Sequence, residues 1–476
     1  MRRVTRYWGL ASIMALAMAI GLMAWIRLDL FRPARVDATK SKNDQKMRDD
    51  GVTQKSSERA RNLVLALAGE QYGPVVESFD RLMRGSLSAE GLESIWNSLV
   101  QQCGAFQKIT AVHIVELPGE HVRADVHCEF ARQSMNVQVG FNSQHQVSSL
   151  RISGLPVPYE TPSYADTGAF VEHEVVAGTI KWPLAGTLTL PKQGKPCPAV
   201  VLVHGSGPHD RDESVGACKP FRDLAWGLAS RGIAVLRYDK RTFVYKDELQ
   251  QMMNRMTVQE EVIDDAIAAV SQLRRHPDID GDRIYIVGHS IGGSLAARIG
   301  LAEPKIAGAV ILAGNVSPLH VLMVKQAEYL HAVANGTLGP ETLDAIRAQA
   351  SAIERLREPN ADAAKDTLLL GASPSYWLDL LSSDTLATAR KYTKPLLILQ
   401  GDRDYQVGTG EFYQWNAALA SRSQVTFRLY QDLNHLFVSG KGQSTPQEYN
   451  SPGHVADTVI ADICEWIHSK GGGICE

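Results

Sequence analysis

The chain has 476 residues, too many for one ordinary domain, and this length indicates two or three domains. Hydrophobic residues make up 44% of it and charged residues 21%, so it can bury a large core and is not disordered overall. The formal net charge is −3 and no block of like charge stands out, which argues against a nucleic-acid partner. Six Cys are too few for a disulfide scaffold, and no Cys-x-x-Cys pair indicates structural zinc.

An apolar run near the N-terminus extends from Trp8 to Ile26 and contains no charged side chain, with Ser12 as its single polar one. As a helix, this run would be about 28 Å long, close to the hydrocarbon thickness of a bilayer. We therefore predict that residues 1–31 form an uncleaved membrane anchor. The alternative is a cleaved signal peptide with Ala17-Met18-Ala19 as the cleavage site, but cleavage there would leave an apolar stump.

Arginines on both sides of this run set its expected orientation. Those before it favour a cytoplasmic N-terminus, and those after it weaken this preference without reversing it. We expect a single span in the inner membrane with the catalytic mass on the periplasmic side, or a periplasmic or secreted protein if the segment is cleaved. The next residues, 32–57, have no apolar periodicity, which predicts a flexible linker. The arginines are Arg2, Arg3 and Arg6 before the run, and Arg27, Arg32 and Arg35 after it.

Residues 58–153 have the pattern of a small α+β domain, in which helices precede strands that have one buried face. We expect an antiparallel meander packed on the helices. The segment resembles the cystatin-like or nuclear-transport-factor-2-like domains that precede some bacterial hydrolases, which implies a packing or binding role. Residues 154–169 are rich in Pro and predict a boundary between domains. The expected elements are helices over 58–68, 75–83 and 89–99, and strands over 122–130 and 135–141.

Residues 170–472 alternate short apolar runs with amphipathic helical patterns, of which 258–275 is the clearest. Buried strands that alternate with helices predict an α/β domain with a parallel sheet covered on both faces. Chemistry collects at the carboxyl ends of such strands, where the loops converge. The expected strands lie at 199–203, 232–237, 284–287, 309–313 and 395–400, after a hairpin over 179–190 that turns at Ala185-Gly186.

The motif Gly288-His289-Ser290-Ile291-Gly292-Gly293 directly follows the strand predicted at 284–287 and opens a helix-like run at 294–301. A sharp turn from strand to helix strains its apex residue, and small neighbours let the backbones approach. The apex hydroxyl then points into the loop crevice above the positive end of the helix. A lone Gly-x-Ser-x-Gly is a weak signal, but this context predicts Ser290 as a nucleophile. The alternative is a Gly-rich turn with a structural serine.

A serine hydroxyl needs a base to remove its proton. His435 offers one, just after the strand-like run at 425–430, and an acid follows the strand at 395–400 as Asp402 or Asp404. Each of these residues alone would be read as a surface residue. Because all of them come just after predicted strands, we expect the serine, an acid and the histidine to meet at one edge of the sheet.

At this point the chain from about 170 to 470 resembles an α/β-hydrolase, of the bacterial serine carboxylesterase type with an N-terminal accessory domain. The resemblance implies a mostly parallel central sheet with helices on both faces and a helical lid. It also implies that Asp404 orients the histidine, with Asp402 as the rival. The family pattern G-x-x-D-x-x-V matches Gly401, Asp404 and Val407, and the family's Asn-His matches Asn434-His435.

Two further segments are similar to family features near the crevice. His204-Gly205-Ser206-Gly207 is similar to the oxyanion loop, and Tyr238-Asp239-Lys240-Arg241 is similar to a strand end. The family often has Gly after that last Arg, where this chain has Thr242.

These parts predict a mechanism in which Ser290 attacks an acyl carbon, His435 takes its proton and Asp404 holds the imidazole. The negative oxygen needs preorganised donors, and we expect the backbone N–H of Ile291 and that of Ser206 or Gly207 to supply them. Water then hydrolyses the acyl-enzyme with the same histidine as base. This chemistry requires no metal and no cofactor.

Residues 316–394 separate two predicted strands by far more than an ordinary connection, which predicts a helical lid over the crevice. The alternative is a packed extension that does not contact substrate. The polar segment 208–213, close to the proposed oxyanion loop, would bind a polar leaving group or form a solvated loop; we favour the loop. The helices expected in the lid lie at 319–334, 341–356 and 361–370.

The function predicted is hydrolysis of small-molecule carboxylic esters. The alternatives are a serine peptidase or acyltransferase on the same fold, or a non-catalytic binding protein built on a decayed hydrolase. Related peptidases usually have a Gly-Gly-Ser-Tyr-Gly-Gly elbow and a propeller domain, which this chain lacks, and a complete triad argues against decay.

Overall fold

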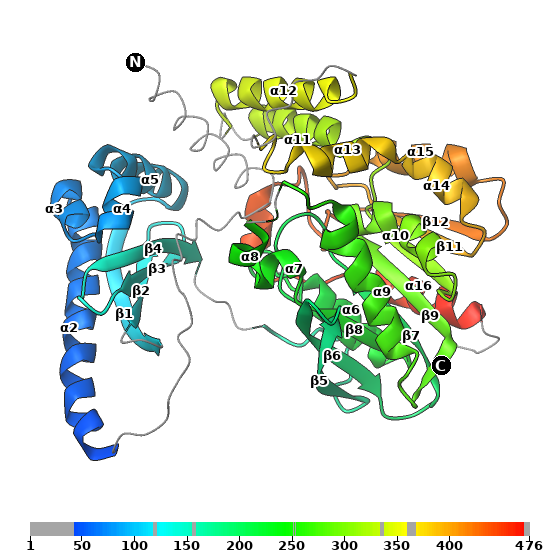
Figure 1. The fold of residues 1–476 in the computed structure, drawn as a ribbon, viewed down its shortest axis with the longest axis horizontal. Coiled ribbons are helices and arrows are strands. Elements are labelled where there is room, and N and C mark those ends of the chain that lie inside the picture. The colour runs from blue at the N-terminus through cyan, green and yellow to red at the C-terminus, as the bar shows by residue number, and fades with distance from the viewer. Residues whose placement is uncertain are drawn as a thin grey trace. The chain divides into compact units, whose positions relative to one another are not determined.

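The computed structural model describes residues 42–117, 121–154, 159–250, 252, 254–333, 338–358 and 368–470. The chain divides into two compact units between Val157 and Pro158, here called the N-terminal and the C-terminal unit (Figure 1). The membrane anchor predicted at residues 1–31 lies outside the described residues and stays a prediction. Among the helices that are described, none is both long and apolar enough to cross a bilayer.

The N-terminal unit contains helices followed by a four-stranded antiparallel meander in the order β1-β2-β3-β4. One sheet face is apolar, most clearly in β2 where alternate residues are buried, and it packs with α2 around Val64, Val126 and Val139. The helices are α2 (Lys42–Ala68), α3 (Tyr72–Glu77), α4 (Arg81–Ser86) and α5 (Ala89–Cys103). The strands are β1 (Phe106–Leu117), β2 (His121–Phe130), β3 (Ser134–Phe141) and β4 (Val147–Gly154).

Two boundaries of this unit differ from the sequence prediction. Helix α2 begins at Lys42, so residues 42–57 are helical where a flexible linker was expected. These residues are mostly polar and form no apolar stripe, and periodicity alone therefore missed the helix. The single helix predicted over 75–83 is divided, because the Asp80 carboxylate accepts the Met83 N–H at 2.8 Å and starts α4 as an N-cap.

The C-terminal unit contains an eight-stranded sheet in the order β12-β11-β10-β9-β7-β8-β6-β5. The strands from β12 to β8 are parallel, and the hairpin β5-β6 adds two antiparallel strands at one edge. The mostly parallel sheet predicted from sequence is therefore present. The strands are β5 (Phe170–Gly178), β6 (Pro183–Pro191), β7 (Cys197–Val203), β8 (Ala234–Tyr238), β9 (Ile279–His289), β10 (Gly308–Leu312), β11 (Leu396–Gly401) and β12 (Val425–Tyr430).

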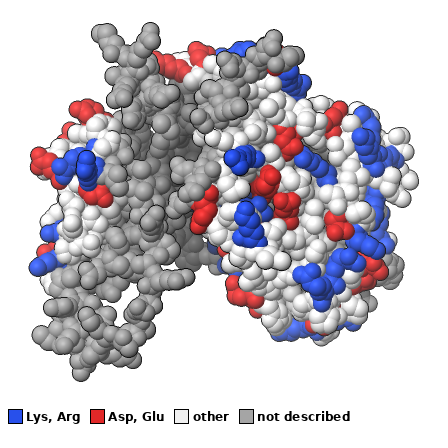
Figure 2. Space-filling view, in the orientation of Figure 1, with Lys and Arg blue, Asp and Glu red and all other residues white. Residues whose placement is uncertain are grey.

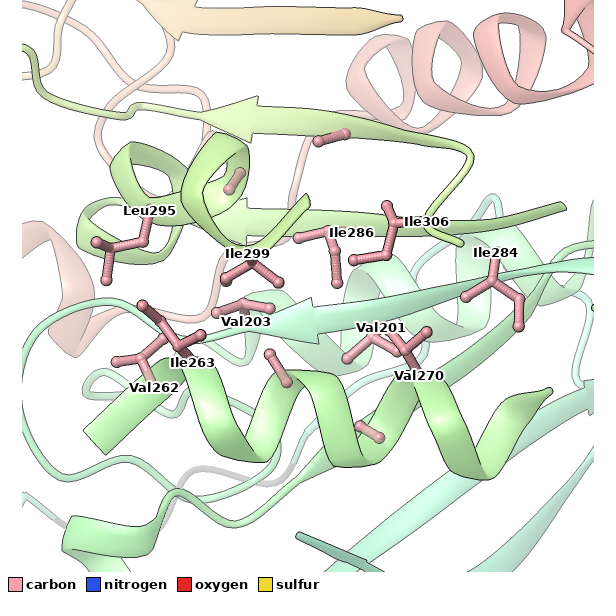
Figure 3. Close-up of a cluster of buried hydrophobic side chains, with 14 of the residues drawn as sticks. Val201, Val203, Val262, Ile263, Val270, Ile284, Ile286, Leu295, Ile299 and Ile306 are labelled. Atoms are coloured by element: carbon pink, nitrogen blue, oxygen red, sulfur yellow. The ribbon is translucent and has the colours of Figure 1, made fainter. Parts of the chain in front are cut away.

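Helices cover both faces of this sheet, which explains why its central strands are apolar without alternation. Figure 3 shows one face, where Val201 and Val203 of β7 point toward Val262 and Val270 on the helical segment opposite. Val200 and Leu202 of β7 pack on the second face with α6 (Pro220–Ala229) and α16 (Asp457–Ser469). The first face is covered by the π-helical turn η1 (Gln259–Ile263), α9 (Asp264–Leu273) and α10 (Ile291–Ala302).

The segment between β10 and β11 is the helical insertion predicted at 316–394. Helices α11 (Leu319–Val333) and α12 (Pro340–Arg355) lie side by side and share a small apolar core that includes Trp377 (Figure 1). Helix α13 (Pro374–Ser382) also contributes Tyr376 to the main core of the unit, and α14 (Thr385–Lys391) packs against α10. Most of the helix predicted over 361–370 lies outside the described residues.

Two further expectations for this unit are corrected. The hairpin turns after Gly178, where φ is +79°, and not at Ala185-Gly186. Gly186 lies inside β6, where a side chain would meet the Arg237 carbonyl oxygen of β8 at 2.9 Å. The predicted linker 154–169 is partly docked, because Tyr159 donates a hydrogen bond to the buried Asp223 at 2.5 Å.

On the visible face of the C-terminal unit, basic and acidic side chains are intermingled (Figure 2).

Candidate active site

Ser290 is the single residue between strand β9 and helix α10, at the carboxyl edge of the parallel sheet. Its backbone has φ 54° and ψ −121°, a conformation that non-glycine residues rarely adopt. The turn is tight because α10 approaches β7 closely: a Cβ on Gly292 would lie 2.4 Å from the Val203 carbonyl oxygen. The motif thus holds Ser290 at the apex of a strained turn.

Asp404 and His435 come from the loops after β11 and β12 and meet at this same edge. Asp404 Oδ2 lies 2.7 Å from His435 Nδ1, and both side chains are buried. The other Asp404 oxygen accepts the N–H groups of Gln406 and Val407 at 2.8 and 2.9 Å. These backbone bonds fix the carboxylate, which in turn fixes the ring of His435.

Asp402, the rival acid, is directed elsewhere. It is exposed, and its carboxylate accepts the Asp432 N–H at 2.9 Å. The loop therefore presents Asp404 to the imidazole and leaves Asp402 to close a surface turn.

His289, the residue before Ser290, contacts His435 and so links the serine turn to the loop that follows β12. The ring centroid of His289 lies 4.6 Å from that of His435, and His289 Nε2 lies 3.0 Å from the His435 carbonyl oxygen. Within the described part of the chain, the Ser290 hydroxyl makes no hydrogen bond to His435. Hydrogen bonds of this kind are often long before substrate binds.

The loop that follows β7 lies directly beside Ser290, since a Cβ on Gly205 would be 3.3 Å from the Ser290 Cβ. Among the described residues, the N–H groups of Ser206, Gly207 and Ile291 have no hydrogen-bond acceptor. Ile291 begins α10, where the first N–H groups lack partners within the helix and attract negative charge. The three positions predicted as oxyanion donors thus have free N–H groups near the serine.

A buried ion pair connects this loop to the serine turn. Glu213 accepts the Gly205 N–H at 2.6 Å with one oxygen, and its other oxygen lies 2.9 Å from His289 Nδ1. Burial alone would raise the pKa of Glu213, but His289 and neighbouring histidines lower it to about 2. Burial alone would lower the pKa of His289, but the charge of Glu213 and the bonds to Glu213 and His435 raise it. The Glu213 carboxylate and the His289 ring therefore face each other next to the serine turn, and each favours the charged form of the other.

Asp212, just before Glu213, is also buried and Arg211 is partly buried, which corrects the solvated loop predicted at 208–213. Asp212 lies inside the unit and bonds to Arg237 at 3.0 Å and to Arg222 at 2.7 Å. Arg211 forms ion pairs with Asp239 and Glu174. These charged side chains therefore have partners of opposite charge within the protein.

The structure also shows how the site edge is attached to the insertion. The ring of Tyr329 in α11 stacks on Tyr405, next to Asp404, with centroids 5.1 Å apart. Gln326 donates to the Gln406 carbonyl oxygen at 2.8 Å. The insertion therefore contacts the loop that carries the acid.

Among the described residues, no group of three His, Cys, Asp or Glu side chains is arranged to hold a metal ion. His204 and His209 stack with a centroid distance of 6.2 Å and contact the carbonyl oxygens of Asp210 and Ser206. Burial lowers the pKa of His204 to about 3, which keeps it neutral.

Sequence reasoning missed Glu213, His289 and Lys240 as supports of the site. Lys240 donates to the Gly205 carbonyl oxygen at 2.8 Å and is buried. A signal for it existed, since a charged residue just past a buried strand tends to lie at the crevice. Nothing in the spacing pairs Glu213 with His289, because their contact depends on how two separate loops fold.

Comparisons with known proteins identify the family of the chain. Residues 194–441 match the Hydrolase_4 family, described as serine aminopeptidase, S33. The chain belongs to this hydrolase family. Its α/β-hydrolase fold, inferred above from sequence, is thereby confirmed. Residues 60–150 match DUF3887, a family of proteins of unknown function.

The proteins to which this chain is similar include named esterases. The chain is 35% identical over 402 residues to Esterase EstD of Thermotoga maritima, covering 84% of this chain and 92% of that protein. It is similar to the solved structure of Est1E from Butyrivibrio proteoclasticus, with 15% identity, 63% of this chain and 99% of that one covered, and a TM-score of 0.41. A Pyrococcus furiosus esterase gives 17% identity, coverage of 66% and 97%, and a TM-score of 0.40.

Proposed function

We propose that this α/β-hydrolase is a serine esterase that cleaves carboxylic esters through an acyl-enzyme on Ser290, His435 and Asp404. The observation that carries the proposal is the buried 2.7 Å contact between His435 and Asp404 at the sheet edge where Ser290 forms the apex of the turn. The similarity to Esterase EstD over most of both chains supports an ester as the substrate.

In the first half of the reaction, Ser290 attacks the acyl carbon and His435 accepts the hydroxyl proton. The contact from Nδ1 to Asp404 fixes the imidazole tautomer, so Nε2 is the nitrogen that can accept this proton. The carboxylate also stabilises the imidazolium that forms. His435 then returns the proton to the leaving alcohol.

The tetrahedral intermediate has a negative oxygen that needs donors already in place. The N–H of Ile291, at the positive end of α10, is one donor, and the N–H of Ser206 or Gly207 is the other. In the second half, His435 removes a proton from water, which attacks the acyl carbon and releases the acid and Ser290.

The alternative on the same fold is a serine peptidase or acyltransferase, and the family description names an aminopeptidase. The experiment that separates these is a comparison of p-nitrophenyl esters of short acids with amino-acid p-nitroanilides, using the wild type and Ser290→Ala. Turnover of the esters that Ser290→Ala abolishes supports the proposal. Preferred turnover of the anilides would replace it with a peptidase, and turnover of neither would favour a binding protein.

We also propose, from the apolar run at 8–26 alone, that residues 1–31 tether this enzyme to a membrane. Fractionation of cells that express the full chain tests this. Activity that sediments with membranes and moves to the soluble fraction when residues 1–31 are removed supports a tether. Soluble activity from the full chain would contradict it.

A further inference from the structure

The oxyanion loop is held at the peptide that carries one proposed donor. Lys240 Nζ donates a hydrogen bond to the Gly205 carbonyl oxygen at 2.8 Å. The Gly205 C=O and the Ser206 N–H belong to the same planar trans peptide and point in opposite directions. By fixing the carbonyl, Lys240 therefore fixes the direction in which the Ser206 N–H points.

Lys240 is itself held by a buried carboxylate. Glu261 Oε1 lies 2.7 Å from Lys240 Nζ, and the two side chains are only 7% and 3% exposed. An ammonium group buried to this extent needs a charged partner, or it loses its proton or moves toward water. Glu261 lies in the π-helical turn η1, which precedes α9.

The insertion reaches Glu261 through helix α13. Burial and the neighbouring Glu261 carboxylate raise the pKa of the Tyr376 hydroxyl well above its ordinary value, and the Tyr376 side chain packs in the main core of the C-terminal unit. Two other residues attach α13 to the same unit and do not contact Lys240 or Glu261. Ser375 donates to the Asn254 carbonyl oxygen at 2.8 Å, and Asp379 pairs with Arg298 of α10 at 2.9 Å.

We infer that Tyr376, Glu261 and Lys240 are positioning residues that orient the Ser206 N–H toward the negative oxygen. The inference rests on the esterase function proposed above and adds a role for the insertion. Helix α13 supports the rate of the chemical step, in addition to any part that the insertion has in choosing the substrate. A residue that holds an oxyanion donor in place stabilises the transition state. Loss of that residue therefore lowers kcat rather than raising KM.

The test compares Tyr376→Phe with Ser375→Ala. Each variant removes one hydroxyl from neighbouring residues of α13, but only the Tyr376 hydroxyl lies beside Glu261, whereas that of Ser375 bonds to Asn254. The measurements are kcat and KM for a p-nitrophenyl ester, and Ki for a trifluoromethyl ketone, whose carbon bonds to Ser290 and whose oxygen becomes the negative oxygen. Loss of a whole oxyanion donor costs about 10²–10³ in rate, and we expect the looser donor in Tyr376→Phe to cost about tenfold.

The expected result is a tenfold lower kcat and a Ki weaker by a similar factor for Tyr376→Phe, with KM within about twofold and Ser375→Ala unchanged. A second variant, Lys240→Met with Glu261→Gln, removes both charges and leaves no buried ion unpaired. It should lose about a hundredfold in kcat while its circular dichroism spectrum stays native.

Two outcomes would overturn the inference in different ways. If Tyr376→Phe matches Ser375→Ala in kcat and Ki, or if the double variant folds and keeps wild-type kcat, the bonds are only structural. If instead the wild type cleaves no ester, or Ser290→Ala keeps its activity, the proposed esterase function fails first and the inference fails with it.

Discussion

The imidazole of His289 lies against that of His435, with ring centroids 4.6 Å apart, and contacts its backbone carbonyl oxygen at 3.0 Å. His289 is the residue just before Ser290 and is paired with Glu213, which holds the Gly205 N–H. One buried ion pair thus joins the loop of the proposed oxyanion donors, the serine turn and the loop of the proposed base.

The first prediction concerns the nucleophile. Ser290→Ala should abolish hydrolysis of p-nitrophenyl esters, because no other hydroxyl occupies the apex of the turn after β9. The free energy of unfolding should stay within about 1 kcal/mol of the wild type, since the side chain is not part of a hydrophobic cluster. Fluorophosphonate labelling followed by peptide mapping checks the assignment, and a label on any other residue would refute it.

The second prediction separates the two aspartates of one loop. Asp404→Asn should lower kcat roughly 10³–10⁴-fold, because an amide at this position favours the wrong imidazole tautomer. Asp402→Asn is the matched control, and it should change kcat less than about threefold because Asp402 only caps a surface turn. Steady-state kinetics of both variants decide the matter, and the reverse order of effects would make Asp402 the orienting acid.

The third prediction follows from the buried pair Glu213–His289. Because the pKa of His289 is raised, His289 contributes fully to the stability of the fold below pH 6.5, its ordinary pKa. This contribution is lost as pH rises through the raised pKa. The pKa of Glu213, lowered from 4.5 to about 2, means that its stabilisation is present above 4.5 and is lost as pH falls toward 2. The pair should therefore stabilise the fold most between about pH 4.5 and 6.5.

A double-mutant cycle with His289→Gln and Glu213→Gln measures this coupling without interference from His454, whose pKa is also raised. The coupling free energy from urea unfolding should be about 1–3 kcal/mol near pH 5.5 and smaller near pH 9. An equal coupling at both pH values would show that His289 carries no charge in the folded protein.

The fourth prediction concerns the start of the insertion. Glu411 of α15 (Thr409–Leu419) is buried and accepts the N–H groups of Val316 and Ser317 and the Ser317 hydroxyl at 2.6–2.8 Å. Glu411→Ala leaves these donors unpaired and should reduce the free energy of unfolding by about 2–3 kcal/mol. Urea denaturation checks this, with the neighbouring exposed Tyr413→Ala as control; equal effects of the two changes would contradict the anchoring role.

Much of the fold could be predicted because its signals are local. Strands such as β7 and β10 are apolar on both faces, and this pattern indicates a covered parallel sheet whatever the tertiary detail. The positions of Ser290 and Asp404 follow from the same pattern, since each comes just after such a strand, whereas His435 follows the partly exposed edge strand β12.

What sequence reasoning missed depends on partners far apart in the chain. Glu213 is buried against His289 and Lys240 against Glu261, and in each pair the two residues come from separate segments of the chain. The hairpin turn was placed wrongly because Gly186 signals a close approach of β8, which looks the same in sequence as a turn. The early start of α2 was missed because a polar helix has no apolar stripe.

The docking of Tyr159 affects how the catalytic unit can be cut away from its N-terminal neighbour. Its hydroxyl, the His454 ring and the Val455 N–H together satisfy the buried Asp223 carboxylate. A chain shortened to begin at β5 would retain the whole sheet yet lose one of these three donors, together with the ring that packs on Trp226. A minimal catalytic fragment should therefore begin ahead of Tyr159.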